Sequence, residues 1–410
     1  MNTQLRTHAD QIIQHAIHAV LPDAAVKQAL DGQTFPGRVI LVAAGKAGWQ
    51  MAKTAWECLG DQICDGIVIT KYEHVKGPIG KLTCLEAGHP VPDKNSFTAT
   101  RQALQLVHGL TAQDTVLFLL SGGGSALFED PLIPEQELQD ITRQLLACGA
   151  DITQMNTIRK RLSRVKGGRF AQACAPAQVY TIVLSDIVGD PLDMIASGPA
   201  YPDSSTCVQA LQIAKDYNLQ LSSATMALLS KETPKQLNNV VTHITGSVQQ
   251  LVNAAADACR ALGYSTDILS TQLQCQAKEA GAMLANKVLA NPSPAQPMAF
   301  LVGGETVVKL TGNGKGGRNQ ELALSAAPAI AGRNACIFSV GSDGTDGPTD
   351  AAGGYIDGDT AATLAAQNID IAAVLQNNDS YHALQHCDGL IITGPTGTNV
   401  NDVAIALLLP

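Results

Sequence analysis

Residues 38–48 read RVILVAAGKAG, an apolar run that ends in a glycine turn and leads into a segment of helical character. A continuous apolar run, unlike an alternating one, predicts a β-strand that is covered on both faces. Similar runs recur along the chain: GIVIT (66–70), TVLFLLSGGG (115–124), VYTIVLSD (179–186), MAFLVGG (298–304), ACIFSVGSDG (335–344) and GLIITGP (389–395). Most are followed by roughly 10 to 20 residues of helical character, which predicts an α/β protein with parallel strands.

The length of 410 residues predicts two domains, because single cores stop growing at roughly 250–300 residues. The polar, proline-containing segment KETPKQLNN (231–239) is the best candidate for the boundary. We therefore expect an N-terminal domain over residues 1–236 and a smaller C-terminal domain over residues 237–410. A second interruption, NPSPAQP (291–297), is expected to be a connection inside the C-terminal domain.

Composition excludes several classes of protein. A net charge of −9 argues against nucleic acid as a partner. The ten cysteines include no close pair of metal-ligand spacing, so they predict free thiols in a reducing compartment. No apolar run approaches the roughly 20 residues of a membrane span, and the N-terminal 20 residues resemble an amphipathic helix more than a signal peptide. These features predict a soluble, cytoplasmic protein.

Glycine turns at two strand ends are candidate anion sites. Lys46 follows Gly45 at the end of the first strand, where a helix is expected to begin and its free amides would attract an anion. A second glycine-rich turn lets main-chain N–H groups approach a ligand closely, and its residues are Ser121, Gly122, Gly123, Gly124 and Ser125. Neither segment is a Walker A loop, since that motif is absent from the sequence.

Two further segments carry clustered charge. MNTIRKRLSRVKGGRFAQA (155–173) is predicted to be a helix, ordinarily with its six cations in solvent, and Lys166 before the Gly-Gly pair is a candidate for phosphate or carboxylate contact. LSDIVGDPLDMIASGP (184–199) places Asp186, Asp190 and Asp193 after a strand. Carboxylates at a strand end suit Mg²⁺ binding or acceptance of a hydroxyl proton.

The segment TGNGKGGRNQE (311–321) has two interpretations. Gly312, Gly314 and Gly317 have the spacing of a dinucleotide site, with a strand expected at VVKL (307–310) and a helix after Arg318. The first acid on a following strand, Asp343, comes late for that motif. The alternative is a phosphate or carboxylate clamp, whose candidate residues are Glu305, Gly314, Lys315, Gly316, Gly317 and Arg318.

Eight segments together resemble the type II glycerate kinases (glycerate 2-kinases). They lie in order between residues 39 and 403: AAGKAG, EAGHPVPD, LLSGGGSAL, RKRLSRVKGGRFA, LSDIVGDPLDMIASGPAYPD, GGETVVKLTGNGKGGRNQE, SVGSDGTDGPTDAAG and TGPTGTNVNDV. The resemblance implies an N-terminal Rossmann-like α/β/α domain, a smaller C-terminal α/β domain of the leucine-rich MOFRL type with a mixed sheet, and an active site in the interdomain cleft. It also implies ATP-dependent phosphorylation of D-glycerate at the C2 hydroxyl, giving 2-phospho-D-glycerate.

Lys46 and Arg318 match basic positions of this family and are the expected catalytic cations. We assign Asp186 to proton acceptance and Asp190 and Asp343 to metal binding, although the sequence leaves open which aspartate does which. The expected cofactors are ATP and Mg²⁺, and a homodimer is one option for the oligomeric state. The enzymatic alternative is an NAD(P)H-dependent hydroxypyruvate reductase, and the non-enzymatic one is a sensor of sugar acids or nucleotides. Phosphoryl transfer is favoured because it needs positioned cations and carboxylates at such turns, and hydride transfer does not.

Overall fold

The computed structural model describes residues 1–187, 189 and 191–410, which form two compact units. The N-terminal unit comprises Ala25–Leu184 and Asp190–Thr245. The C-terminal unit comprises Met1–Ala24, Ser185–Gly189 and Gly246–Pro410. Both units are α/β, so the expected fold class is confirmed.

The N-terminal unit is built on a six-stranded sheet of order β3-β2-β1-β4-β5-β6. Parallel pairs join β1 to β2 and β4, β2 to β3, and β4 to β5. Strand order reverses beside β1, because the chain first adds β2 and β3 on one side and then β4 and β5 on the other. The strands are β1 (Val39–Ala44), β2 (Ile63–Lys71), β3 (Thr83–Ala87), β4 (Thr115–Leu120), β5 (Gln178–Leu184) and β6 (Val240–Gly246).

Apolar strands form the centre of this unit. Every residue of β1 and β4 is buried, as the continuous apolar runs predict. A separate small core joins four helices: α6 (Glu135–Ala147), α7 (Ile152–Arg161), α9 (Cys207–Asp216) and α10 (Ser223–Leu229). The remaining elements are α2 (Pro22–Leu30), α3 (Gly48–Leu59), η1 (Gly60–Gln62), α4 (Lys94–Leu106), α5 (Gly124–Leu127), α8 (Arg169–Cys174) and η2 (Ile195–Ser197).

The C-terminal unit contains a second six-stranded sheet, of order β11-β10-β9-β12-β8-β7. Its β7 and β8 pair in parallel, whereas β12 pairs antiparallel with both β8 and β9. The sheet is therefore mixed, as expected. The strands are β7 (Ser265–Leu273), β8 (Met298–Gly304), β9 (Ala335–Gly341), β10 (Gly353–Asp357), β11 (Leu390–Ile391) and β12 (Asp402–Leu408).

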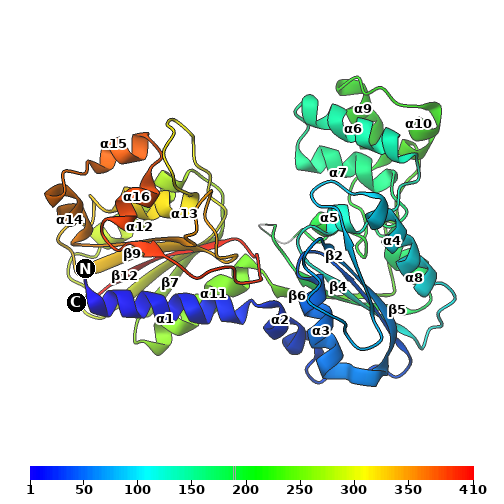
Figure 1. Cartoon of the computed structure of the whole chain (residues 1–410), viewed down its shortest axis with the longest axis horizontal. Coiled ribbons are helices and arrows are strands. Elements are labelled where there is room, and N and C mark those ends of the chain that lie inside the picture. Colours follow the sequence, from blue (N-terminus) through cyan, green and yellow to red (C-terminus); the bar gives the residue numbers. More distant parts are fainter. Residues whose placement is uncertain (188, 190) are drawn as a thin grey trace. The chain divides into compact units, whose positions relative to one another are not determined.

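Helices cover both faces of the mixed sheet. One apolar core packs α1 (Thr3–Ala19) and α11 (Val248–Ala261) against it, and Figure 1 shows α1 lying beneath the strands beside α11. The other core packs α12 (Ala277–Leu289), α13 (Arg318–Ala326) and α16 (Ser380–Gln385) on the opposite face. The remaining helices are α14 (Thr360–Ala366) and α15 (Ile371–Gln376). No helix in the described part of the chain is long and apolar enough to cross a bilayer.

Contacts divide the chain differently from the boundary expected at residue 236. Helix α1 packs through Leu5, Ile12 and Ile13 on the core of the C-terminal unit, because its apolar stripe has its partners there. Strand β6, by contrast, extends the sheet of the N-terminal unit. The chain consequently passes between the units near residues 24, 184, 189 and 245.

Two local expectations were wrong. VVKL (307–310) forms no strand: Val307 makes an isolated bridge to Gln276, and Leu310 is 80 % exposed. Residues 155–173 are not one helix: α7 ends at Arg161, and α8 begins at Arg169 after the turn at Gly167 and Gly168. Both glycines have positive φ (58° and 84°), a conformation that interrupts a helix.

Candidate functional site

The point where strand order reverses in the N-terminal unit brings two predicted anion turns together. In open α/β sheets, ligands bind outside the carboxyl ends of the strands at such a switch point. Here the turn after β1 touches the turn after β4: the Lys46 amide donates to Gly122 O at 2.8 Å and the Ala47 amide to Ser121 Oγ at 3.0 Å. Gly45 has φ 130°, and a Cβ there would lie 2.1 Å from Ser121 Oγ. Only glycine therefore permits this contact.

The turn after β4 presents main-chain donors beside a cation. Among the described residues, the amides of Gly122 and Gly123 have no hydrogen-bond acceptor, and both residues are half-exposed. The Lys46 side chain is exposed at the same place, since a Cβ on Gly123 would lie 3.3 Å from Lys46 Cγ. Free amides and an ammonium are the groups that bind phosphate or carboxylate oxygens.

Buried polar contacts hold the glycine turn from behind. Ser125 Oγ lies 3.0 Å from Ser197 Oγ, which in turn donates to Asn156 Oδ1 at 3.0 Å. Ala196 and Ser197 both have positive φ (51° and 62°), a strained conformation for residues with a Cβ. Strain of this kind persists only where surrounding contacts impose it, and it is concentrated at functional sites.

Lys166 supports the glycine turn and does not face solvent. Its side chain is fully buried, and Nζ donates to Ser125 O at 2.7 Å and to Phe128 O at 3.2 Å. Nζ also lies 3.4 Å from Glu129 Oε2 in a buried ion pair. Burial lowers the pKa of Lys166 to about 8, while the Glu129 charge opposes the change. The expected ligand contact by Lys166 is therefore replaced, in this structure, by contacts that position Ser125.

The predicted solvent-facing cations of residues 155–173 are partly core residues. Lys160 is 2 % exposed and lies 3.0 Å from Asp203 and 3.3 Å from Asp193. Arg161 is fully buried and pairs with Asp203 and Glu232. Asp193, one of the three aspartates after β5, thus belongs to an internal ion-pair network that joins the small helical core to residues 203–232.

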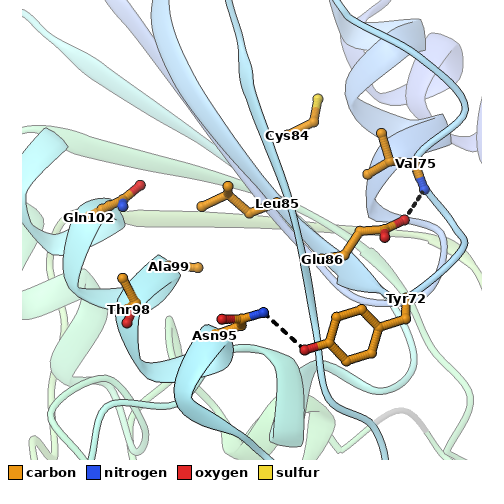
Figure 2. A pocket seen from close by; sticks show the side chains of 9 residues that line it. All are labelled: Tyr72, Val75, Cys84, Leu85, Glu86, Asn95, Thr98, Ala99 and Gln102. Carbon is orange, nitrogen blue, oxygen red and sulfur yellow. Dashed lines mark hydrogen bonds between the residues drawn. The ribbon is translucent and has the colours of Figure 1, made fainter.

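A shallow pocket at the sheet edge is lined by Glu86, the first residue of the segment EAGHPVPD (86–93), as Figure 2 shows. Glu86 accepts the Val75 amide at 2.9 Å, and Asn95 donates to Tyr72 Oη at 3.0 Å. Tyr72 Oη donates to Asp93 at 2.6 Å, and Asp93 also caps α4 through the Ser96 amide. Burial alone would raise the pKa of Asp93, but hydrogen bonds from Tyr72, Ser96 and Gly88 hold it below its ordinary value. The segment that carries His89 is therefore firmly anchored.

In the C-terminal unit, most backbone amides of the glycine-rich loop 311–317 donate hydrogen bonds to residues 377–379. The Thr311 and Gly312 amides donate to Asn378 Oδ1, at 2.7 and 2.9 Å. The amides of Gly314 and Lys315 donate to Asn377 O and Asp379 Oδ1, at 2.8 and 2.9 Å. If this loop binds an anion, as expected, only the amides at its C-terminal end and its side chains are left to make the contacts.

The glycines of this loop are explained by close packing, not by approach to a pyrophosphate. A Cβ on Gly312 or Gly314 would meet Asn377 at 2.5 Å, and one on Gly316 would meet Ser380 Oγ at 2.3 Å. At the start of α13, the amides of Asn319 and Gln320 donate to the carboxylate of Asp346, at 3.1 and 2.9 Å. The place where a dinucleotide motif would hold its phosphates is thus filled by a buried carboxylate. This geometry argues against the dinucleotide interpretation.

Arg318, the first residue of α13, is held by two carboxylates. Nη1 donates to Glu305 Oε1 at 2.5 Å, Nε lies 2.6 Å from Asp402 Oδ2, and Nη2 donates to Asp402 Oδ1 at 3.1 Å. Burial opposes the charge on Arg318, but the two carboxylates raise its pKa overall. Burial raises the pKa of Asp402 to about 6, and the guanidinium limits that rise. The Arg318 side chain is 31 % exposed, so a ligand in solvent can reach it.

Arg318 lines a pocket of about 700 Å³. Its other walls include the predicted residues Gly314, Gly316, Gly317 and Asp343, together with Asp346, Glu321 and Leu310. Lys315 lies with Nζ 4.0 Å from the ring centre of Tyr381, in a cation–π contact. The structure therefore brings most of the predicted residues of 305–346 together at one pocket.

The predicted metal ligands do not form a single cluster in the described residues. Asp343 is half-buried, and its carboxylate and that of Asp402 lie on the same side of Gly341, 3.3 and 3.4 Å from the position of an added Cβ. Asp186 lies two residues after the end of β5 and is half-buried, and Asp190 lies outside the described residues. Among the residues that the structure describes, no group of three His, Cys, Asp or Glu side chains could hold a metal ion.

Sequence reasoning missed His89, Asp402 and the segment 377–380. His89 and Asp402 lie inside two of the segments that carry the family resemblance, EAGHPVPD and TGPTGTNVNDV, so those motifs were an available signal. No sequence motif includes residues 377–379, and only the folded structure shows that they contact loop 311–317.

Comparisons with known proteins show which family the chain belongs to. Residues 8–230 match the family described as "Domain of unknown function (DUF4147)", and residues 298–402 match the MOFRL family. A D-glycerate 2-kinase from Thermotoga maritima is 52% identical, with 99% of each chain covered. The crystal structure of glycerate kinase from that organism superposes with a TM-score of 0.95 at 50% identity, covering 99% of this chain and all of the other.

A relative from Agrobacterium vitis, 37% identical over 91% of this chain and 87% of its own, is named provisionally as a hydroxypyruvate reductase. Its name matches the enzymatic alternative, but its likeness is well below that of the Thermotoga protein. The near-complete coverage by the kinase, in sequence and in structure, decides the assignment. The chain therefore belongs to the glycerate kinase family that combines a DUF4147 domain with a MOFRL domain.

Proposed function

We propose that this protein is a glycerate 2-kinase, which transfers the γ-phosphoryl group of ATP to the C2 hydroxyl of D-glycerate. The observation that carries the proposal is the identity of 52% to a D-glycerate 2-kinase over almost the whole chain. The site geometry supports it, because a turn with free amides and an exposed lysine suits an anionic substrate. Because the chain as a whole carries a net charge of −9, an anionic substrate has to be bound by a local cation of this kind.

Lys46 and Arg318 are the proposed catalytic cations. Phosphoryl transfer asks the protein mainly to position two anions and to stabilise charge that spreads over the moving group. Lys46 stands exposed beside the amides of Gly122 and Gly123, and Arg318 is partly exposed at the pocket of the C-terminal unit. We propose that both cations serve the same transfer step.

Mg²⁺ is the proposed metal, with Asp343 as its protein ligand. In nucleotide sites this ion is bound by one or two carboxylates together with substrate phosphates and water, so a cage of three protein ligands is not required. The half-buried carboxylate of Asp343 beside that of Asp402 fits such a partial ligand set. Bound Mg²⁺ would neutralise charge on the phosphates. Asp186 and Asp190 stay candidates for metal or proton handling.

The decisive experiment is a coupled assay of the purified protein with D-glycerate, ATP and Mg²⁺, in which NMR locates the phosphate of the product. We expect phosphate on the C2 oxygen and loss of turnover when the metal is chelated. A parallel assay with hydroxypyruvate and NADH or NADPH tests the reductase alternative. Oxidation of the nicotinamide at a rate equal to any kinase rate would overturn the proposal.

A further inference from the structure

His89 lies at the glycine turn of the N-terminal unit, although it belongs to a different strand end. It follows β3, at the edge of the sheet, and its ring reaches the turn after β4. A Cβ on Gly123 would lie 3.0 Å from Cδ2 and 3.2 Å from Nε2 of His89, and 3.3 Å from Lys46 Cγ. The imidazole, the ammonium side chain and the two free amides therefore border one small region.

The imidazole is available for proton transfer. Neither ring nitrogen makes a hydrogen bond with any residue that the structure describes, and the ring is half-exposed. The two serine hydroxyls at the turn have partners: Ser121 Oγ accepts the Ala47 amide, and Ser125 Oγ is paired with Ser197. The free amides of Gly122 and Gly123 are donors only. A lysine ammonium such as that of Lys46 has donors and no acceptor. His89 thus offers a free proton acceptor at this turn.

The surroundings of His89 favour the neutral form of its imidazole. Burial, followed by the charges of Lys46, Lys71 and His74, lowers the pKa of His89 below its ordinary value. A neutral imidazole has one ring nitrogen that can accept a proton. The backbone beside the ring is held in place, because Asp93 accepts both Tyr72 Oη and the Gly88 amide.

We propose that His89 accepts the proton of the substrate hydroxyl during phosphoryl transfer, a role that rests on the proposed glycerate 2-kinase function. The C2 oxygen forms a bond to the γ-phosphorus, and the bond from that phosphorus to the β,γ-bridging oxygen breaks. ADP leaves with the bonding electrons, and the hydroxyl proton moves to a ring nitrogen of His89. Solvent takes the proton once the product has left. This assigns to His89 the task that sequence reasoning gave to Asp186.

The test compares His89→Gln with His108→Gln, an exposed histidine of the same unit that follows α4. We expect kcat of His89→Gln to fall by about 10²-fold or more, with KM for D-glycerate changed by less than about threefold. For the wild type, kcat/KM should decrease at acid pH as His89 becomes protonated. The midpoint of this decrease should lie below about 6.5, the ordinary pKa of histidine. His89→Gln should lack that limb, and His108→Gln should keep both rate and limb.

A second measurement does not depend on turnover. The imidazole proton signal of His89, identified by its absence from the NMR spectrum of His89→Gln, should shift when D-glycerate is added to the wild type without ATP. Overturning results are a His89→Gln enzyme with the acid limb intact and kcat within about threefold of wild type, or a His89 signal that D-glycerate does not move. Failure of the proposed function would be distinct, since the wild type itself would then form no phosphoglycerate.

Discussion

Arg318 and Asp402 are joined by two contacts, an ion pair from Nε to Oδ2 at 2.6 Å and a hydrogen bond from Nη2 to Oδ1 at 3.1 Å. Such a pair uses the planar fork of the guanidinium, which a lysine cannot reproduce. Arg318 is thereby oriented by β12 before any ligand arrives, with Nη1 directed to Glu305.

We expect Arg318→Lys and Arg318→Ala to lower kcat, the alanine variant by about 10²-fold or roughly 3 kcal/mol in the barrier. The physical reason is that a cation placed for the transition state lowers the barrier more than it tightens ground-state binding. Steady-state kinetics with D-glycerate and ATP measure this. Arg333→Lys, an exposed arginine of the same unit, is the matched control. A folded Arg318→Ala enzyme that loses less than about threefold in kcat would refute the role.

Asp402 predicts a pH-dependent stability. Burial raises the pKa of Asp402 to about 6 in the folded state. Between about pH 4 and pH 6, the carboxyl group is therefore protonated in the folded chain and ionised in the unfolded chain. Stability linked to Asp402 is therefore fully present below about pH 4 and is lost as the pH rises to about 6. Urea unfolding between pH 4 and pH 7 should show a smaller pH slope for Asp402→Asn than for the wild type. Equal slopes in the two proteins would contradict this origin of the pH dependence.

Lys46→Ala is expected to reduce kcat by about 10²-fold, because it removes a cation that stabilises the transferring group. The fold should be retained, because the Lys46 side chain is exposed. Lys53→Ala, which removes an exposed lysine of α3, should leave kcat unchanged. If Lys46 and Arg318 act on the same transfer step, the double variant should lose less than the sum of the two single effects. Full additivity would indicate independent roles.

The buried ion pair of Lys166 and Glu129 can be tested by a double-mutant cycle of unfolding free energies. Removing one partner of a buried ion pair leaves the other charge uncompensated, so Lys166→Met and Glu129→Leu should each cost roughly 3 kcal/mol of unfolding free energy. The double variant should cost less than the sum of the single losses. Chemical denaturation of the four proteins measures the coupling. A coupling within about 0.5 kcal/mol of zero would show that the pair is not an energetic unit.

Gly123→Ala tests the space in front of the glycine turn. Gly123 has φ 87°, and its added Cβ would press on His89 and Lys46, whereas a Cβ on Gly109, with φ 76°, would meet nothing within 4 Å. Both substitutions carry the strain of positive φ, so their difference isolates the steric effect. We expect similar losses of stability, and a larger loss of kcat for Gly123→Ala alone. Equal activities of the two variants would exclude a functional role for this space.

Much of the strand pattern of the N-terminal unit could be predicted from the sequence alone. Continuous apolar runs such as residues 39–44 and 115–120 are buried strands, and their glycine ends lie together at the switch point, because parallel strands deliver their carboxyl ends to one edge of a sheet. Resemblance across eight segments supplied the family and the mixed sheet of the C-terminal unit. Cations at helix and loop positions were harder to interpret: Lys160, Arg161 and Lys166 look solvent-exposed by pattern and are buried in fact.

Tertiary structure decided what local pattern could not. The glycines of loop 311–317 have the spacing of a nucleotide motif, yet they serve contacts with residues 377–380, more than 60 positions away. Helix α1 packs on the far end of the chain, and His89 reaches the turn after β4 from the sheet edge. Spacing in sequence records only which residues share a strand or a turn. Whether an amide is free for a ligand, or a lysine buried under a loop, depends on neighbours that only the folded chain supplies.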